Sequence, residues 1–307
     1  MTDDADDVLN VRFYTDFPSC NMHCPYCIAG HHADAGRPES HWDAARYDRI
    51  IDHLCTIPHR INIRIGVGGE FFTSKPLIEG ARRLSRAAPV VGLNLITNLS
   101  LSFAQYQRIL APFAQEKLAF VASCHPTEIA DLDGWLDVAR RMAAEYDLMV
   151  MFVAYPPALE SLPALRDRIH DAGLECFVQP FMGEFAGRHY PAAYTEAERA
   201  LVRSLMYCRH DEEYLLELKK PGLCSAGQRA FFIDSWGKVY PCGAGPYAQP
   251  IGDFTRSSVV ALRPGPAACP FSTCQCDTEN INTLEFSERY IRPGINQHRF
   301  RAHPALW

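Results

Sequence analysis

Apolar strands alternate with amphipathic helices through the first two thirds of this 307-residue chain. The period of the apolar side chains predicts six strands, at 11–17, 61–65, 90–98, 118–125, 148–155 and 174–181. It predicts helices between them, at 40–55, 75–87, 103–115, 131–146 and 161–172, and one more at 194–210. Strict alternation of this kind predicts a parallel sheet with right-handed crossovers, either doubly wound or curved into a barrel.

Three cysteines follow the first predicted strand within one short loop. Cys20, Cys24 and Cys27 have the spacing CxxxCxxC, and thiolates placed so compactly suit an iron–sulfur cluster. A cubane cluster has four irons, so three cysteines leave one iron open to a substrate or cofactor. The alternatives are a zinc site, which usually shows two separated CxxC pairs, and three unrelated cysteines.

The cysteine spacing, with an aromatic residue, Tyr26, directly before Cys27, resembles the signature of the radical S-adenosylmethionine (radical SAM) enzymes. The resemblance implies that Cys20, Cys24 and Cys27 hold a [4Fe–4S] cluster, and that its open iron and Tyr26 bind SAM. It implies that one electron from an external reductant, such as flavodoxin or ferredoxin, lets the cluster cleave SAM to a 5′-deoxyadenosyl radical. That radical removes a hydrogen atom from the substrate. The implied fold is α/β, a partial (β/α)6 TIM-like barrel over residues 10–210.

The second predicted strand is followed by Gly68, Gly69 and Glu70. Glycine lets a ligand approach the backbone, and a carboxylate accepts hydrogen bonds from an ammonium group. This sequence resembles the motif with which radical SAM enzymes hold the amino group of SAM.

Two polar residues end the third and fourth predicted strands. Asn98 and Ser123 stand where the family contacts the ribose or carboxylate of SAM. Leu99 departs from the glycine that often follows the asparagine in the family.

Polar side chains share one face of several predicted strands. Alternate residues of a barrel strand face the lumen, so this pattern predicts a polar lumen that binds a hydroxyl- or amine-rich ligand. The alternative is that these side chains are buried and paired with one another. Catalysis in such barrels takes place at the carboxyl ends of the strands. The candidate substrate contacts there are Asp16, His125, Tyr155 and Gln179.

Residues 211–307 have little periodic structure and hold five cysteines after position 220. Residues 231–242 read as a hairpin that turns near Ser235. Cys224 and Cys242 bracket this hairpin in a pattern that resembles the SPASM/twitch extension of radical SAM enzymes. The resemblance implies an auxiliary [4Fe–4S] cluster, and therefore two clusters in the chain. The expected ligands are Cys224, Cys242 and two of the last three cysteines, with Cys274 and Cys276 preferred over Cys269.

Composition and charge exclude some classes of protein. A formal net charge of −6 argues against a nucleic-acid partner. The acidic, polar first residues are unlike a targeting peptide, and no apolar run is long enough to span a membrane. Cysteines that cluster with ligand-like spacing indicate a reducing cytoplasm rather than a disulfide scaffold.

The expected substrate is a small polar molecule, a sugar or an aminoglycoside, because no peptide-recognition domain precedes the predicted barrel. The size and layout resemble neomycin-type epimerases and aminocyclitol dehydrogenases. Epimerisation needs a thiol that returns a hydrogen atom, and the C-terminal cysteines outnumber the four expected ligand positions by one. We therefore expect an epimerase with Cys269 as the hydrogen donor and Cys124 as the second candidate. A dehydrogenase, a peptide-modifying maturase and a non-catalytic electron carrier are the alternatives.

Overall fold

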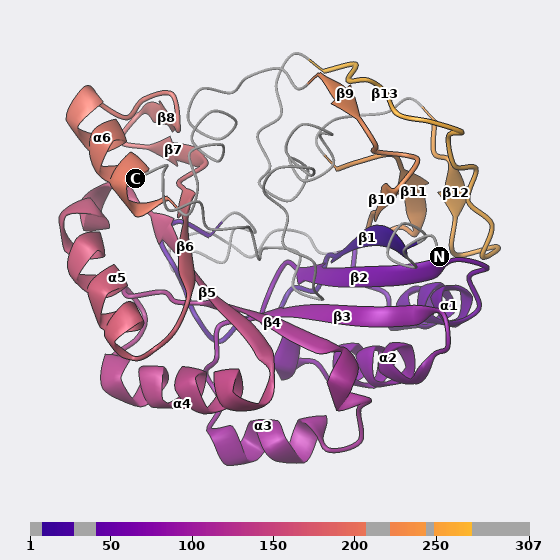
Figure 1. Cartoon of the computed structure of the whole chain (residues 1–307), viewed down its shortest axis with the longest axis horizontal. Coiled ribbons are helices and arrows are strands. Elements are labelled where there is room, and N and C mark those ends of the chain that lie inside the picture. The colour runs from indigo at the N-terminus through magenta and orange to yellow at the C-terminus, as the bar shows by residue number, and fades with distance from the viewer. Residues whose placement is uncertain (1–7, 28–40, 207–221, 244–248, 272–307) are drawn as a thin grey trace, which may run out of the picture.

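The chain was analysed as a computed structural model, which describes residues 8–27, 41–206, 222–243 and 249–271. Six parallel strands pair in chain order and form a curved sheet, with helices along its outer side (Figure 1). The strands are β1 (Val8–Thr15), β2 (Arg60–Val67), β3 (Val90–Thr97), β4 (Leu118–Ser123), β5 (Asp147–Ala154) and β6 (Cys176–Pro180). The predicted partial barrel is confirmed.

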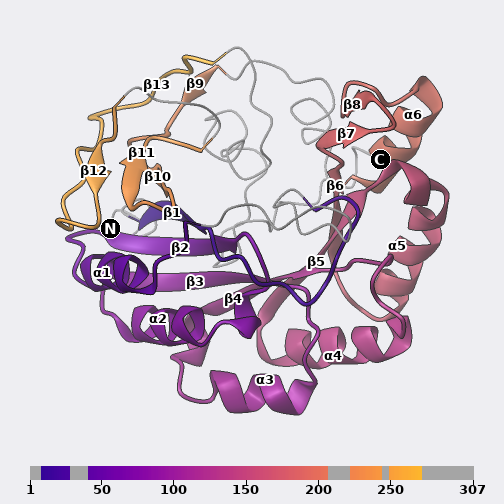
Figure 2. The same cartoon turned by 180° about the vertical axis from the view of Figure 1, so that it is seen from behind.

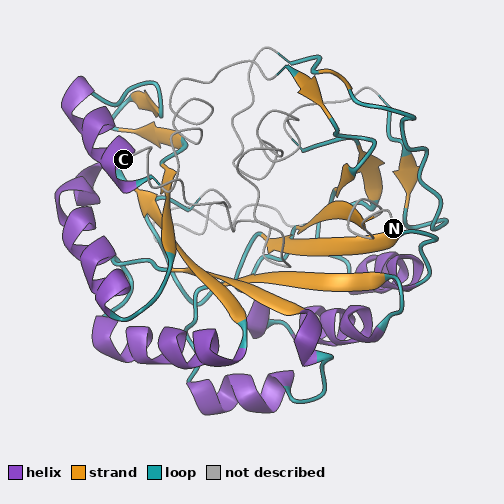
Figure 3. Cartoon of the chain, viewed as in Figure 1, coloured by secondary structure: helices purple, strands orange, loops and turns teal. Residues whose placement is uncertain are grey.

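Helices connect successive strands, as the alternation predicts (Figure 3). They are α1 (Ala44–Cys55), α2 (Lys75–Arg86), α3 (Phe103–Leu110), α4 (Leu132–Glu145), α5 (Leu162–Asp171) and α6 (Glu196–Leu205). Short 3-10 turns are η2 (Phe71–Thr73), η3 (Gln115–Lys117) and η4 (Pro156–Ser161). Side-chain caps decide where several helices begin: Asp43 accepts the first N–H groups of α1, and Thr195 forms a capping box with Glu198 at α6.

The two faces of β1 differ as the alternation predicts. Val11 and Phe13 are buried toward the helices, where the Phe13 ring stacks on Tyr47 of α1 at 5.8 Å between centroids. Arg12 lies on the opposite, inner face. It stands in register with Arg64 of β2, which in turn pairs with Asn94 of β3. The inner face of β1–β3 is therefore polar.

The inner face of β4–β6 is mostly apolar, which corrects the prediction of a polar lumen. Val121, Met149 and Phe177 form a buried cluster there, joined by Ile96 and Met151. These strands are buried on both faces, so their sequences are nearly continuous apolar runs. Such a run has no polar alternation from which the character of the inner face could be predicted.

The C-terminal extension joins the same sheet. Strand β10 (Ala230–Ile233) pairs in parallel with β1, and β11 (Lys238–Tyr240) and β12 (Gly252–Asp253) follow it, giving the order β12-β11-β10-β1-β2-β3-β4-β5-β6. The predicted hairpin is the β10–β11 pair, and its turn has Gly237 at φ +83°. The sheet thus runs from the predicted barrel domain into the predicted C-terminal domain. The expected division of the chain between residues 210 and 211 stays a prediction.

Two further strand pairs lie outside the large sheet. The first joins β7 (Gly183–Phe185) to β8 (Arg188–Tyr190), between the last predicted strand of the barrel and its last predicted helix. Its turn residues Ala186 and Gly187 both have positive φ, as a two-residue hairpin turn requires. The second pairs β9 (Leu223–Cys224) with β13 (Ala267–Ala268). From behind, β7–β8 and β10–β12 are seen at opposite ends of the curved sheet (Figure 2).

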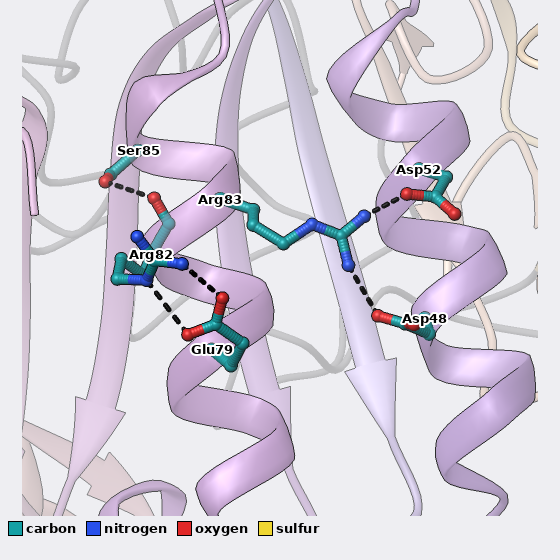
Figure 4. Close-up of polar contacts among 6 residues, drawn as sticks. All are labelled: Asp48, Asp52, Glu79, Arg82, Arg83 and Ser85. Carbon is teal, nitrogen blue, oxygen red and sulfur yellow. Dashed lines mark hydrogen bonds and ion pairs between the residues drawn. The ribbon is translucent and has the colours of Figure 1, made fainter.

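Exposed ion pairs lie on the outer helices. Arg83 of α2 reaches both Asp48 and Asp52 of α1, and Arg82 pairs with Glu79 within α2 (Figure 4). Pairs this exposed stabilise a fold little, so the contact between α1 and α2 depends mainly on their buried side chains. Within the described residues, no helix has both the length and the apolar character needed to cross a membrane.

Candidate functional site

A cavity of about 230 Å³ opens at the carboxyl ends of the barrel strands. Its walls come from the CxxxCxxC loop and from the ends of β2, β3, β4 and β6, together with inner residues of β5. The predicted site residues that line it are Cys20, Cys24, Tyr26, Cys27, Gly68, Gly69, Glu70, Asn98, Ser123, His125 and Gln179. Residues predicted from five separate segments thus meet in one place.

Other predicted residues do not line this cavity. Asp16 borders a small hollow between β1 and α1, and its carboxylate accepts the backbone N–H of His41 at 2.8 Å. Tyr155 lies behind Tyr26, with 5.0 Å between the ring centroids. Cys124 is fully buried in the core outside the lumen, because it lies one position past Ser123 and so points to the other side.

The two glycines after β2 are needed for a close backbone contact. A Cβ added at Gly69 would lie 1.9 Å from the carbonyl oxygen of Ser19, at the start of the cysteine loop. At Gly68 an added Cβ would lie 3.3 Å from the carbonyl oxygen of Phe17. The Glu70 N–H donates to the Ser19 oxygen at 2.8 Å, so this segment fastens the cysteine loop to the end of β2.

The Glu70 carboxylate is buried and accepts three hydrogen bonds from the chain. Its Oε1 accepts from the Thr97 hydroxyl at 2.7 Å and from the Phe72 N–H at 3.1 Å. Its Oε2 accepts from the Asn98 N–H at 2.7 Å. Burial raises the pKa of Glu70 although these bonds oppose the shift. Most of the acceptor capacity of Glu70 is therefore used within the protein, and its predicted contact with an ammonium group stays a prediction.

Asn98 is a junction of several segments. Its side-chain Nδ2 donates to Oδ1 of Asn21, inside the cysteine loop, at 2.9 Å. Its carbonyl oxygen accepts from the indole N–H of Trp135 on α4 at 2.9 Å. The next residue, Leu99, has φ +52°, the backbone conformation that glycine adopts most easily. The backbone here thus has the shape that the family's glycine would favour, although the residue is leucine.

Sequence reasoning missed Thr97 and Trp135. Thr97 donates a hydrogen bond to Glu70, and Trp135 donates one to Asn98. Neither residue belongs to a motif with a recognisable spacing. The only signal was the position of Thr97 as the last residue of an apolar strand, where a hydroxyl group is buried.

Tyr26 and His125 form a pair in the cavity wall. The Tyr26 hydroxyl and Nδ1 of His125 are 3.3 Å apart. Burial lowers the pKa of His125 to about 4, so the imidazole is neutral near pH 7. Burial also raises the pKa of Tyr26, which keeps its phenol protonated.

The three thiols of the cysteine loop suit an iron–sulfur cluster. All of them line one cavity, and thiolates are the ligands that such clusters use. In a cubane cluster each thiolate binds a different iron. Burial raises the pKa of Cys20, and burial together with the Glu128 charge raises that of Cys24 to about 12. A bound cluster would offset this by stabilising the thiolates.

The described C-terminal cysteines lie away from this cavity. Cys269 directly follows β13 and donates its N–H to the Gly222 oxygen at 3.4 Å, across the strand pair from Cys224. Ala267 pairs with Cys224. Cys269, two residues after Ala267, is therefore the diagonal neighbour of Cys224 on the same face of this two-stranded ribbon. Cys242 follows β11 and is buried. Cys274 and Cys276 lie outside the described residues.

The sequence matches no family profile and no curated protein. Among solved structures, native anSMEcpe with bound AdoMet superposes with a TM-score of 0.55 at 13% identity, over 91% of this chain and 82% of that one. The chain shares the fold of that protein. The complex of anSMEcpe with AdoMet and the Cp18Cys peptide gives a TM-score of 0.52 at 14% identity, over 82% of this chain and 79% of the other. BtrN in complex with AdoMet and 2-DOIA covers 82% of this chain and 80% of its own at 14% identity, but its TM-score is only 0.39. At 13–14% sequence identity, the likeness to anSMEcpe establishes the fold alone.

Proposed function

We propose that this protein is a radical SAM enzyme that removes a hydrogen atom from a small polar molecule. The observation that carries the proposal is the meeting of Cys20, Cys24 and Cys27 with Gly68 and Gly69 on one cavity at the carboxyl ends of parallel strands. The shared fold supports it, because AdoMet is bound in the structure of anSMEcpe. An electron carrier would need the thiols but not a cavity of this size beside them.

Cys20, Cys24 and Cys27 would hold a [4Fe–4S] cluster, which, with SAM bound, supplies the 5′-deoxyadenosyl radical. The chain's own contribution is placement. Gly68 and Gly69 bring bare backbone to the cavity surface, and Ser123 adds a hydroxyl group at the end of β4.

Two side chains support a substrate with hydroxyl or amino groups. Gln179 lines the cavity from β6, and His125 lines it from the loop after β4. When the Tyr26 hydroxyl donates to Nδ1 of His125, the proton of the neutral ring is on Nε2, which can donate to a substrate oxygen. Met151, Val153 and Phe181 complete the wall with apolar surface. A ring that has polar edges and apolar C–H faces, such as a sugar or cyclitol, combines both requirements.

The position of Cys269 bears on the outcome of the reaction. As the diagonal neighbour of Cys224, it is placed better as a ligand of an auxiliary cluster than as a hydrogen donor at the cavity. Cys124 is a poor donor for a different reason, because its thiol is buried in the core and does not line the cavity. If the product is inverted, the donor is then the cysteine among 274 and 276 that does not bind the cluster. If neither thiol donates, the substrate radical would instead lose a proton and pass one electron to the auxiliary cluster, and the enzyme would be a dehydrogenase.

The test starts from protein reconstituted with iron and sulfide without oxygen. We expect about eight irons per chain, and 5′-deoxyadenosine when SAM and a reductant are added. Replacing Cys20, Cys24 and Cys27 together with alanine should leave about four irons and stop SAM cleavage. Cys55→Ala, on α1 and away from the cavity, is the matched control. SAM cleavage by the triple variant would refute the proposal.

A screen of sugars, aminoglycosides and short peptides in deuterated water identifies the substrate class. Deuterium at an inverted carbon indicates epimerisation, because a thiol exchanges its hydrogen with the solvent. An oxidised product without deuterium indicates dehydrogenation, and a modified peptide would contradict the small-molecule assignment.

A further inference from the structure

We propose that Asn98 is a positioning residue that fixes the cysteine loop through Asn21, rather than a ligand of SAM. The inference rests on the proposed function, since its consequence concerns the cluster and SAM. It differs from the expectation drawn from the sequence, in which Asn98 contacts SAM directly.

The amide of Asn98 is held rigidly before any ligand binds. Asn98 and Glu70 are both nearly inaccessible to solvent, so the 2.7 Å bond from the Asn98 N–H to Glu70 is shielded from water. Trp135 holds the carbonyl group of Asn98, and Asn98 Oδ1 accepts the Ser100 N–H at 3.1 Å. With backbone and side-chain oxygen fixed in this way, Nδ2 can point in one direction, toward Asn21.

The cysteine loop is tied at alternate residues. The Ser19 oxygen accepts from the Glu70 N–H at 2.8 Å, Asn21 accepts from Asn98 at 2.9 Å, and the His23 N–H donates to Glu128 at 3.0 Å. These ties come from the segments that follow β2, β3 and β4 in turn. Asn21 and His23 are exposed on the outside of the loop, while Met22 and Cys24 between and after them are buried. The ties thus turn the cysteine side of the loop toward the cavity.

The Asn21–Asn98 bond joins two side chains, so replacing either residue removes it. The Ser19 tie is made by backbone atoms alone, and the His23 tie joins a backbone N–H to the Glu128 carboxylate. Without the Asn21 tie, three thiols remain to bind a cluster, so the cluster still assembles. The loop would then hold a cluster less accurately beside Gly68 and Gly69, and SAM would bind more weakly.

A double-mutant cycle tests this on the reconstituted full-length protein. The variants are Asn21→Ala, Asn98→Ala and the pair, and the measurements are iron and sulfide content, the equilibrium affinity for SAM, and the EPR spectrum of the reduced cluster with and without SAM. We expect full iron content, SAM affinity lowered about fivefold by either single change, and a broadened spectrum in the presence of SAM. Because both residues act through one bond, the double variant should bind SAM no more weakly than either single variant.

Different outcomes separate the inference from the proposed function. If Asn98→Ala weakens SAM binding while Asn21→Ala does not, or if the two effects add, Asn98 acts on the ligand itself and the inference is wrong. If neither change alters affinity or spectrum, it is also wrong. Asn21 lies on an exposed loop, so its variant remains informative even if Asn98→Ala fails to fold. His23→Ala, whose tie is made by the backbone, is the control and should behave as wild type. A wild-type protein that forms no cluster on Cys20, Cys24 and Cys27 would instead overturn the proposed function, and this inference with it.

Discussion

Glu70, just after β2, accepts a hydrogen bond from the backbone N–H of Asn98, just after β3, over 2.7 Å. The other oxygen of the same carboxylate accepts from Thr97 and Phe72. One buried side chain therefore joins two neighbouring strand ends at the point where the cysteine loop crosses them. The Glu70 carboxylate therefore has a structural role in this site.

Replacing Glu70 with glutamine should destabilise the fold. The amide group would turn an NH₂ toward backbone or hydroxyl donors that now point at oxygen, leaving a buried donor without an acceptor. The expected loss is about 1–3 kcal/mol in the free energy of unfolding. Urea denaturation measures it, with the exposed Glu79→Gln as the control. A Glu70→Gln protein as stable as wild type would show that these bonds contribute little.

Gly69→Ala should prevent the cysteine loop from reaching its place. The added methyl group would lie 1.9 Å from the Ser19 carbonyl oxygen, and neither partner is a flexible side chain. We expect iron content to fall by about one cluster, or four irons, with the auxiliary cluster retained. Gly265→Ala is the matched control because nothing lies within 4 Å of its added methyl group. Normal iron content in the Gly69 variant would mean that the loop tolerates the shift.

The parts of this site that the sequence predicted are those with a repeating signal. Alternating strands and helices predicted a parallel sheet with crossover helices. The resemblance carried by the cysteine spacing implied the barrel and the residues at the strand ends beside the cysteine loop. The parallel pairing of β10 with β1 was not predictable, because it joins segments more than 200 residues apart in sequence without a periodic pattern. Asn21 and Trp135 were missed because a single polar residue does not reveal its partner. Only the fold brings each of them to Asn98.

At position 99, the glycine variant should be more stable than the alanine variant, which is the reverse of the usual order. Its φ of +52° strains any residue with a Cβ, while its side chain is buried. Both Leu99→Ala and Leu99→Gly lose the buried side chain, at about 2–5 kcal/mol. Glycine also relieves the backbone strain, so Leu99→Gly should be the more stable variant by about 1 kcal/mol. At Leu93, within β3, alanine should be the more stable of the two. If the alanine variant were more stable than the glycine variant at both Leu99 and Leu93, the result would argue against a strained backbone at Leu99.

His125 should make stability fall in mild acid. Burial lowers its pKa to about 4 in the folded protein, below the value of about 6.5 in an unfolded chain. Between those values the unfolded chain takes up a proton that the folded protein does not. The stability contributed by neutral His125 is thus fully present above about pH 6.5 and is lost as the pH falls toward 4, by at most about 3 kcal/mol.

The measurement compares urea midpoints of wild type and His125→Gln from pH 7 to pH 4.5, without oxygen. The wild type should lose more stability over this range than the variant, which has no ring to protonate. His189→Gln is the control, because His189 is exposed on β8. Parallel pH profiles for wild type and His125→Gln would show that the imidazole titrates normally in the folded state.

Replacing Cys269 distinguishes between two roles for this residue, cluster ligand and hydrogen donor. Its place beside Cys224, across the β9–β13 pair, leads us to expect that Cys269→Ala loses the auxiliary cluster and holds about four irons per chain. SAM cleavage should continue, since Cys20, Cys24 and Cys27 are untouched. A donor would behave differently: both clusters would remain, 5′-deoxyadenosine would form, and no inverted product would appear. Cys176→Ala, buried at the start of β6, controls for the loss of a thiol that has neither role. Full iron content in Cys269→Ala would return the donor role to Cys269 and leave Cys274 and Cys276 as the ligands that complete the auxiliary cluster.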